Sequence, residues 1–411
     1  MYMVELFAGA GGLLEGFMRA GFKSVACVEK NKDACDTLRT RHAFWKLKNK
    51  NNLFTYNEYL NKNISREQLW SFLDADPVIN FEITESTLDV IESAIRNRMV
   101  LSGIKKIDIF TGGPPCQTFS VAGRRRRGNN ISCDPRTHLY VYYAELLKRF
   151  KPEMFVFENV TGILSAKLDG EFIFQKIKSE FLKVGYLFDF RTLNATDFGV
   201  LQNRNRVVIV GWKKKRKMNY PELGSFSYGN FKVNDLFSDL PEVNPSGCPD
   251  NIRYSSKPSE YLVKSGIRAD NFDILTWHVP RKLNETDSTI YRMAVEKWNS
   301  EERRIKYSEL PYHLKTHKNH ASFEDRFKVV AGNLPYSHTL VAHIARDGHY
   351  YIHPDINQNR SITVREAARI QSFPDDYFFE GSRTSVFMQI GNAVPPLMAE
   401  KIAEKIKEFY Q

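Results

Sequence analysis

The sequence predicts an α/β fold, in which a doubly wound, mainly parallel sheet carries a smaller, loop-rich domain as an insertion. Three observations support this prediction. Through roughly the first 215 residues, short apolar segments alternate with helical stretches, as in chains built from strand–helix–strand units. From residue 213 to about 359 this periodicity is lost, and Pro, Gly, Ser and Asn are scattered. Order returns at Ile362, and the last residues form an amphipathic helix.

The first predicted unit is an apolar strand, Met3–Phe7, followed by a Gly-rich turn and a helix with apolar residues at positions 13, 14, 17 and 18. Gly21 supplies the stop of this helix. The other predicted strands are Val25–Val28, Ile107–Phe110, Phe155–Phe157 and Val207–Val210, and the helices include Leu139–Phe150 and Glu171–Val184.

The C-terminal part opens with the sequence of a capping box, Thr363-Val364-Arg365-Glu366, and Phe373-Pro374 ends that helix. Pro395-Pro396 then precedes the terminal helix. We expect residues 1–215 to form the first part of the large domain, 216–385 the small domain, and 386–411 a return to the large one.

Composition limits the class of protein. With 42% hydrophobic and 26% charged residues, the 411-residue chain is neither disordered nor low in complexity. It has no apolar run of about 18 residues, and we expect no secretory signal because no basic region precedes the apolar segment Met3–Phe7. The five cysteines lack C-x-x-C spacing, which argues against a disulfide framework or thiolate zinc site and favours a reducing cytosol. His313, His317 and His320 have helical spacing, but their polar surroundings favour an ordinary surface over a metal site.

The Gly-rich turn predicts a ligand site. Gly9, Gly11 and Gly12 let the backbone approach a ligand closely at the start of a helix. Leu14 stands where the dinucleotide fingerprint needs Gly, and no P-loop Lys follows. Glu29 ends the second strand and is placed to bond ribose hydroxyls. A nucleoside without phosphates, such as S-adenosylmethionine, suits this combination, and the alternative is a turn that serves packing alone.

Cys116 lies in the stiff segment Gly113-Pro114-Pro115-Cys116, after a strand and at the predicted carboxyl edge of the sheet. The run Arg124–Arg127 raises the local positive potential, which favours thiolate. The alternative, a buried apolar cysteine, fits Cys27 and Cys35 better, because the sequence around Cys116 is turn-like.

Glu158 ends another apolar strand, where a carboxylate must be paired or act as an acid. Strand alternation places Gln202, Arg204 and Arg206 on one face, and these arginines could orient Glu158 or grip a phosphate or base. A structural salt-bridge cluster is an equally good explanation of this group taken alone.

In this order, the motifs resemble the C5-cytosine-specific DNA methyltransferase family of prokaryotic, restriction–modification type. The blocks that carry the resemblance are Phe7–Gly12, Gly113–Gln117, Phe157–Val160, Gln202–Arg206, Arg360–Pro374 and Gln389–Pro396. Residues 213–335 have no match, and in this family that region is the variable target-recognition domain. The resemblance implies a Rossmann-like, S-adenosylmethionine-dependent methyltransferase domain.

By resemblance, Cys116 is the nucleophile that adds to C6 of cytosine, and Glu158 stabilises the adduct at N3. Arg206 would contact the flipped base, with Arg204 supporting the site. Residues 120–136 match the loop that closes over this base, and their expected DNA contacts are Ser120, Arg124, Arg125, Arg126, Arg127 and Arg136.

The implied cofactor is S-adenosylmethionine, with S-adenosylhomocysteine as product and no metal. Its expected contacts are Phe7, Gly9, Gly11, Gly12, Glu29, Glu82, Asn392 and Val394. Glu82-Ile83 is the best candidate in this sequence for the Asp-Ile pair that the family uses to bind the adenine amino group. Lys30 occupies a position where relatives have a residue that packs on the adenine.

The implied partner is double-stranded DNA, bound by a cytoplasmic, prokaryotic monomer that associates with the nucleoid. A cognate restriction endonuclease would act on the same site without necessarily touching the protein. The net charge of +11 includes the runs Arg124–Arg127 and Lys213–Lys217, both expected near the DNA cleft. The alternatives are a tRNA cytosine-5 methyltransferase, which the long segment 213–358 disfavours, and a non-catalytic DNA-binding protein.

Overall fold

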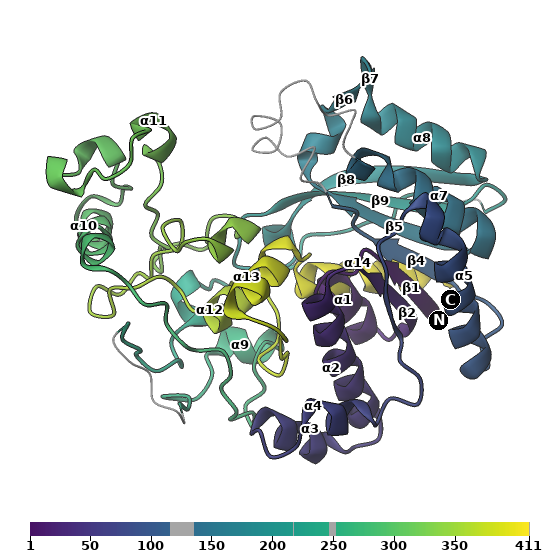
Figure 1. The fold of residues 1–411 in the computed structure, drawn as a ribbon, viewed down its shortest axis with the longest axis horizontal. Coiled ribbons are helices and arrows are strands. Elements are labelled where there is room, and N and C mark those ends of the chain that lie inside the picture. The colour runs from purple at the N-terminus through teal and green to yellow at the C-terminus, as the bar shows by residue number, and fades with distance from the viewer. Residues whose placement is uncertain (116–134, 217, 246–251, 411) are drawn as a thin grey trace.

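The computed structural model describes residues 1–115, 135–216, 218–245 and 252–410. Its centre is a seven-stranded sheet of order β3-β2-β1-β4-β5-β9-β8 (Figure 1). β1 to β5 are parallel, and β9 runs antiparallel to both of its neighbours. The strands are β1 (Tyr2–Leu6), β2 (Lys23–Glu29), β3 (Val78–Asn80), β4 (Ile109–Gly112), β5 (Met154–Asn159), β8 (Tyr186–Asn194) and β9 (Asn205–Lys213), and a separate small hairpin pairs β6 (Lys167–Leu168) with β7 (Glu171–Phe172).

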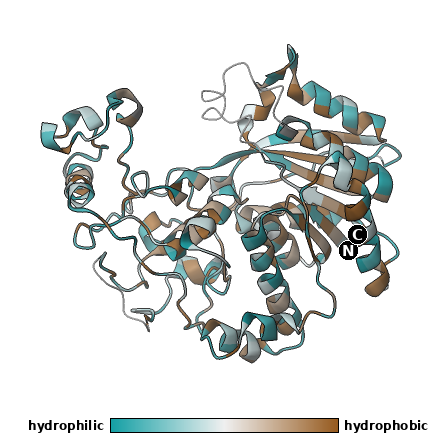
Figure 2. Cartoon of the chain, in the orientation of Figure 1, coloured by the Kyte–Doolittle hydropathy of each residue, from teal (hydrophilic) through white to brown (hydrophobic). Residues whose placement is uncertain are grey.

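Helices cover both faces of the sheet, as a doubly wound fold requires. Val4 and Leu6 of β1 join the apolar cluster under α5 (Leu88–Leu101), α7 (Leu139–Phe150) and α8 (Ile173–Lys183). Met3, which points the other way, joins the cluster under α1 (Gly12–Arg19) and α14 (Pro396–Lys407). The strands are consequently apolar on both sides, and Figure 2 shows them as largely brown arrows in the right half of the molecule.

Three further helices extend from the end of β2 and pack on a core of their own, which includes Phe44, Tyr56 and Leu69. They are α2 (Lys32–Asn49), α3 (Leu53–Leu60) and α4 (Arg66–Trp70). Short 3₁₀ helices occur at Glu85–Thr87, Pro135–His138, Thr161–Leu164, Ala195–Asp197, Val233–Leu236, Tyr307–Glu309, Tyr312–Leu314, Ala342–Ala345 and Glu408–Tyr410.

Beyond β9, loops and helices predominate, and the described part of the chain has no further named strand. The helices are α9 (Glu260–Lys264), α10 (Glu285–Glu301), α11 (His320–Phe323), α12 (Val364–Ile370) and α13 (Arg383–Asn392). α10 and α11 lie at the left end of Figure 1, far from the sheet. They enclose a separate core around Tyr291, Val295 and Phe327.

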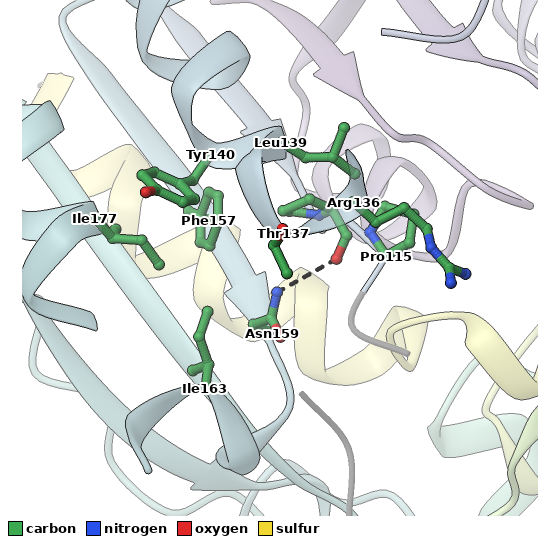
Figure 3. A pocket seen from close by; sticks show the side chains of 10 residues that line it. Pro115, Arg136, Thr137, Leu139, Tyr140, Phe157, Asn159, Ile163 and Ile177 are labelled. Atoms are coloured by element: carbon green, nitrogen blue, oxygen red, sulfur yellow. Dashed lines mark hydrogen bonds between the residues drawn. The ribbon is translucent and has the colours of Figure 1, made fainter. Parts of the chain in front are cut away.

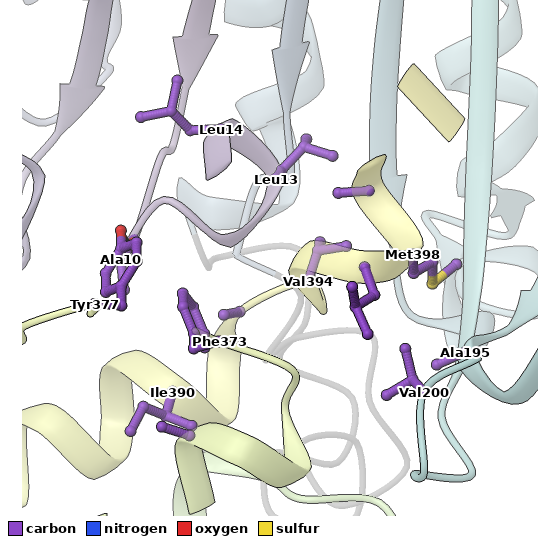
Figure 4. Close-up of a cluster of buried hydrophobic side chains, with 14 of the residues drawn as sticks. Ala10, Leu13, Leu14, Ala195, Val200, Phe373, Tyr377, Ile390, Val394 and Met398 are labelled. Carbon is purple, nitrogen blue, oxygen red and sulfur yellow. Dashed lines mark hydrogen bonds between the residues drawn. The ribbon is translucent and has the colours of Figure 1, made fainter. Parts of the chain in front are cut away.

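The C-terminal segment packs back onto the first strand–helix unit. Figure 4 shows Phe373, Tyr377 and Val394 gathered beside Leu13 and Ala10 in one buried cluster. Arg41, a buried arginine of α2, pairs with one acid from each of these two segments. Its guanidinium lies 2.6 Å from a carboxylate oxygen of Glu15, in α1, and 2.8 Å from one of Asp376, in the C-terminal segment. The boundary expected at residues 385–386 falls inside α13, and the proposed division into domains stays a prediction.

The predicted α/β class and mainly parallel sheet are confirmed. Helix α7 has the predicted limits, and each predicted strand coincides with or overlaps an observed one. The capping box is present, with the Glu366 N–H donating to Thr363 Oγ1 at 3.2 Å and the Thr363 N–H donating to Glu366 Oε2 at 2.7 Å. β3, β8 and the hairpin of β6 and β7 were not predicted.

The basic run Lys213–Lys217 was expected near the DNA cleft, and this prediction is wrong for residues 213–216. Because β9 is antiparallel, its end pairs with the start of β5, at the sheet edge opposite the Gly-rich turn. There the Lys213 ammonium lies 2.9 Å from Glu153 Oε1, and the Arg216 guanidinium lies over the Tyr410 ring. These charges therefore do not line the edge on which Glu158 lies.

Candidate active site

Four of the predicted site residues lie at or just beyond the carboxyl edge of the five parallel strands. Glu29 is the last residue of β2, whereas Phe7, Glu82 and Gly113 directly or closely follow β1, β3 and β4. Glu158 is the penultimate residue of β5. Since these strands are neighbours in the sheet, residues more than 150 positions apart in sequence share one edge, where ligand sites of open α/β sheets lie.

The turn after β1 has an unusual backbone. Phe7, Gly9 and Gly11 all have positive φ, at 55°, 53° and 75°. Glycine adopts this region freely, but a bulky aromatic residue does so only under strain of about 1–3 kcal/mol, which tends to occur at functional sites. The strain at Phe7 thus points to a ligand-binding turn.

Two of its glycines are needed for packing. A Cβ on Gly12 would lie 2.2 Å from the Val394 carbonyl oxygen, and one on Gly11 would lie 2.7 Å from a Leu38 methyl carbon. The Tyr377 hydroxyl also donates to the Ala10 carbonyl at 2.5 Å. By contrast, a Cβ on Gly9 would have no neighbour within 4 Å. The turn is therefore closely packed behind Gly11 and Gly12 and open at Gly9.

Glu29 is held by the backbone beside this opening. Its Oε2 accepts the Gly9 N–H at 2.8 Å, and its Oε1 accepts the Asn31 N–H at 2.8 Å. Each carboxylate oxygen keeps a further lone pair, which suits the two hydroxyls of a ribose.

The return segment packs against the back of this turn. Asn392, at the end of α13, is exposed, and Val394 is buried against Gly12. An open glycine, an oriented carboxylate and an exposed amide are a donor and acceptor set that fits S-adenosylmethionine.

Glu158 forms an ion pair with Arg206, whose Nε lies 2.7 Å from Glu158 Oε1, and the side chains are only 12% and 11% exposed. Burial raises the pKa of the Glu158 carboxyl, although the charges of Arg206 and Arg204 oppose this effect. A carboxyl group with a raised pKa can hold a proton and donate it in a hydrogen bond.

The segment after β4 lies directly against this carboxylate. A Cβ on Gly113 would lie 2.5 Å from Glu158 Oε2, so only glycine leaves room for the acid in this position. The next residue is fixed as well, because the Asn159 side-chain amide donates to the Pro114 carbonyl at 3.3 Å (Figure 3). Pro114, two residues before Cys116, is thus anchored to the end of β5.

A cavity of about 10 Å³ lies beside Pro115 and Asn159, and Arg136 is at its border (Figure 3). That volume accommodates about one water molecule. Cys116, Ser120, Arg124, Arg125, Arg126 and Arg127 lie outside the described residues.

Arg204 is fully buried and supports the site from behind. Its guanidinium donates to three backbone carbonyls, those of Leu340 at 2.5 Å, Gly391 at 3.1 Å and Ala393 at 2.9 Å. These bonds connect the residue before β9 to the end of α13. The structure therefore places Arg204 as a brace of the scaffold, with its charge acting on Glu158 from a distance.

Sequence reasoning missed the part that Gln202 plays in this brace and the contact of Tyr377 with the Gly-rich turn. Gln202 donates to the Ile370 carbonyl at 3.0 Å and accepts the Leu340 N–H at 2.9 Å. Gln202 belongs to a recognised block, which was a usable signal, whereas nothing near Tyr377 in sequence indicated its contact with the Gly-rich turn.

The structure also places two of the three histidines with helical spacing. His313 lies in a 3₁₀ turn and His320 in α11, so no single helix carries the three spaced histidines. Among the residues that the structure describes, no group of three metal-ligating side chains is close enough to hold a metal ion. In the same residues, no helix has the length and apolar character needed to span a bilayer.

Comparison with known proteins agrees with this geometry. The family model of C-5 cytosine-specific DNA methylases matches residues 1–64 and 79–408. Type II methyltransferase M.Bpa9945I of Bacillus paralicheniformis is 40% identical over 99% of both chains, and M.DdeI of Desulfomicrobium norvegicum is 31% identical over 100% of this chain and 89% of its own. An E. coli prophage protein described as a DNA modification methyltransferase covers 100% of this chain and 99% of its own with a TM-score of 0.65 and 22% identity, which shows a shared fold. The chain belongs to the C-5 cytosine-specific DNA methylase family.

Proposed function

We propose that this protein transfers a methyl group from S-adenosylmethionine to C5 of a cytosine flipped out of duplex DNA, with Cys116 as the nucleophile. The observation that carries the proposal is the contact between Glu158, held by Arg206, and the segment Gly113–Pro115 that leads into Cys116. This contact between Glu158 and the segment lies on the same sheet edge as the open Gly-rich turn.

The proposed chemistry explains why both a thiol and an acid are required. Cytosine C5 is a weak nucleophile, and a thiolate that adds to C6 makes C5 enamine-like. As the S–C6 bond forms, negative charge develops toward N3, where Glu158 holds a proton or donates a hydrogen bond. S-adenosylmethionine supplies the electrophilic methyl carbon. Loss of the C5 proton then restores the C5=C6 bond and breaks the S–C6 bond, returning the thiolate of Cys116.

Arg206 would hold the acid and contact the flipped base, while Arg204 positions the start of β9. The target carbon is inaccessible inside a duplex, so the base must leave the stack. For DNA contacts we propose the side chains of Ser120, Arg124, Arg125, Arg126, Arg127 and Arg136, because consecutive guanidinium groups bind phosphates well.

For the cofactor, Glu29 would take the ribose hydroxyls and Gly9 would let the ligand approach the turn. The remaining proposed contacts are Phe7, Gly11, Gly12, Glu82, Asn392 and Val394. We propose no resident metal, because each chemical step above uses a thiol, a carboxyl group or the sulfonium.

The names of the relatives support a role in a restriction–modification system. Because these relatives are type II methyltransferases, we propose that this protein methylates a specific DNA site in a restriction–modification system. In this proposal it acts as a monomer in the cytoplasm, and a cognate endonuclease need not touch it. Residues 216–385 would form the recognition domain.

Methyl transfer with a radiolabelled methyl donor, measured on duplex DNA and on tRNA, tests the substrate class. The expected result is label in DNA that disappears in Cys116→Ala. Bisulfite sequencing of DNA from expressing cells should then show methylcytosine at one recurring sequence. Label in tRNA alone, or random methylation, would contradict the proposal.

A further inference from the structure

The ends of β2 and β3 are locked together beside Glu29. The side-chain amide of Asn80 donates to the Glu29 carbonyl at 3.1 Å and to the Lys30 carbonyl at 3.0 Å. Glu29 and Asn80 are direct partners in the parallel ladder. One amide thus fixes the backbone of Lys30 relative to the segment that follows β3.

An ion pair joins the two segments just beyond this lock. Lys30 Nζ lies 2.8 Å from Glu82 Oε1, and the two side chains are 51% and 55% exposed. The backbone of Glu82 is held separately, because its carbonyl accepts the Thr87 hydroxyl at 2.6 Å. Within the described chain, Glu82 Oε2 accepts no hydrogen bond, which leaves that oxygen available to a ligand.

We propose that Lys30 is a positioning residue for the adenine of the cofactor: its ammonium fixes Glu82 so that Oε2 accepts an N–H of the adenine 6-amino group. This inference rests on the proposed use of S-adenosylmethionine. The Lys30 backbone is adjacent to the ribose-binding candidate Glu29, and Glu82 approaches from the neighbouring strand, so the ion pair lies beside Glu29 on the side of β3.

The proposed arrangement makes the site selective for a 6-amino purine. A carboxylate accepts hydrogen bonds and has none to donate, so a 6-oxo purine would place one acceptor against another. It also makes the selectivity sensitive to salt, because an exposed ion pair is screened as ionic strength rises. Such pairs add little to folded stability, so Lys30 can be replaced without unfolding the protein.

The test is calorimetric binding of S-adenosylhomocysteine and of S-inosylhomocysteine, which differ at the purine 6-position and carry no net charge. The unmodified protein should prefer the adenine compound by about 10–100-fold, the range for a hydrogen bond to a charged group. Glu82→Ala should bring the ratio close to one. Lys30→Met keeps the length of the side chain without its charge and should lower the preference by up to about fivefold, the value of an exposed ion pair.

Two variants isolate the role of Lys30. Lys30→Arg keeps the charge and should restore the preference, and Lys32→Met, an exposed lysine two residues away, should leave it unchanged. Salt should lower the preference of the unmodified protein but not that of Lys30→Met. Equal selectivity in Lys30→Met and unmodified protein would overturn the inference and leave the proposed function intact. A failure of unmodified protein to bind S-adenosylhomocysteine would refute the proposed cofactor and this inference together.

Discussion

Replacement of Gly113 by Ala tests whether the position of the Glu158 carboxylate controls catalysis. The added Cβ would lie 2.5 Å from Glu158 Oε2, whereas real Cβ atoms essentially never make contacts under 3.0 Å. The oxygen must therefore retreat by about 0.5 Å or more. Gly113 does not have positive φ, so alanine can adopt its backbone conformation without strain.

Displacements near 1 Å from productive geometry can reduce a rate by about 100-fold, so we expect kcat for Gly113→Ala to fall about 10–100-fold. Single-turnover methyl transfer to duplex DNA measures the effect on chemistry, and thermal denaturation verifies the fold. Gly224→Ala is the matched control, because a Cβ at that position has no neighbour within 4 Å and kcat should not change.

A double-mutant cycle separates displacement of the acid from a general disturbance. If Gly113→Ala acts through Glu158, it should cost little more in a protein that already carries Glu158→Gln. Additive losses of rate in the double variant would show that Gly113→Ala does not act through Glu158, and so would a kcat within twofold of the unmodified value in folded Gly113→Ala.

Three other variants have expected outcomes. In Arg206→Gln the pKa of Glu158, already raised by burial, should rise further because the opposing Arg206 charge is gone. If the protonated acid is the active form, the alkaline limb of the pH–rate profile should move to higher pH. A move of this limb to lower pH would contradict the prediction. Although burial favours protonation, the Arg360 guanidinium holds the pKa of Glu366 well below its usual range, so Glu366 contributes stability above a pH of about 4 that is lost on acidification. Arg360→Met should lower the free energy of unfolding by about 3–5 kcal/mol at neutral pH, measured by urea denaturation, because it leaves the Glu366 charge unpaired. This loss should become smaller in acid, where Glu366 is protonated. A loss of the same size in acid would show that the unpaired charge is not its cause. In Gly12→Ala a Cβ would lie 2.2 Å from a carbonyl oxygen of the returning segment, so S-adenosylhomocysteine should no longer raise the melting temperature; an unchanged rise would show that this contact is dispensable.

The sequence predicted those features that depend on local pattern. The short apolar runs of β1, β2, β4 and β5 identified strands, and Gly9, Gly11 and Gly12 identified the turn, because only glycine tolerates that backbone or that packing. Glu158 was recognisable because an acid at the end of a buried strand needs a partner, and Arg206 is that partner.

The remaining features depend on contacts between distant parts of the chain. Arg204 was expected to support the site, but its partners could not be named, because its hydrogen bonds run to carbonyls more than 130 residues away. The run beginning at Lys213 was assigned to the wrong edge because the direction of β9 is set by strand pairing and not by composition. The pair of Lys30 with Glu82 was equally invisible, since it forms only once β2 and β3 are neighbours.

In the proposed mechanism Cys116 attacks the cytosine ring during methyl transfer, and covalent trapping detects the bond that this attack forms. Duplex DNA with 5-fluorocytosine in its methylated site should stop the reaction after methyl transfer, because fluorine cannot leave C5 as the proton does. Digestion and mass spectrometry of the product should then find the nucleotide attached to the peptide that contains Cys116. An adduct on another residue, or normal turnover of ordinary DNA by Cys116→Ala, would contradict the account.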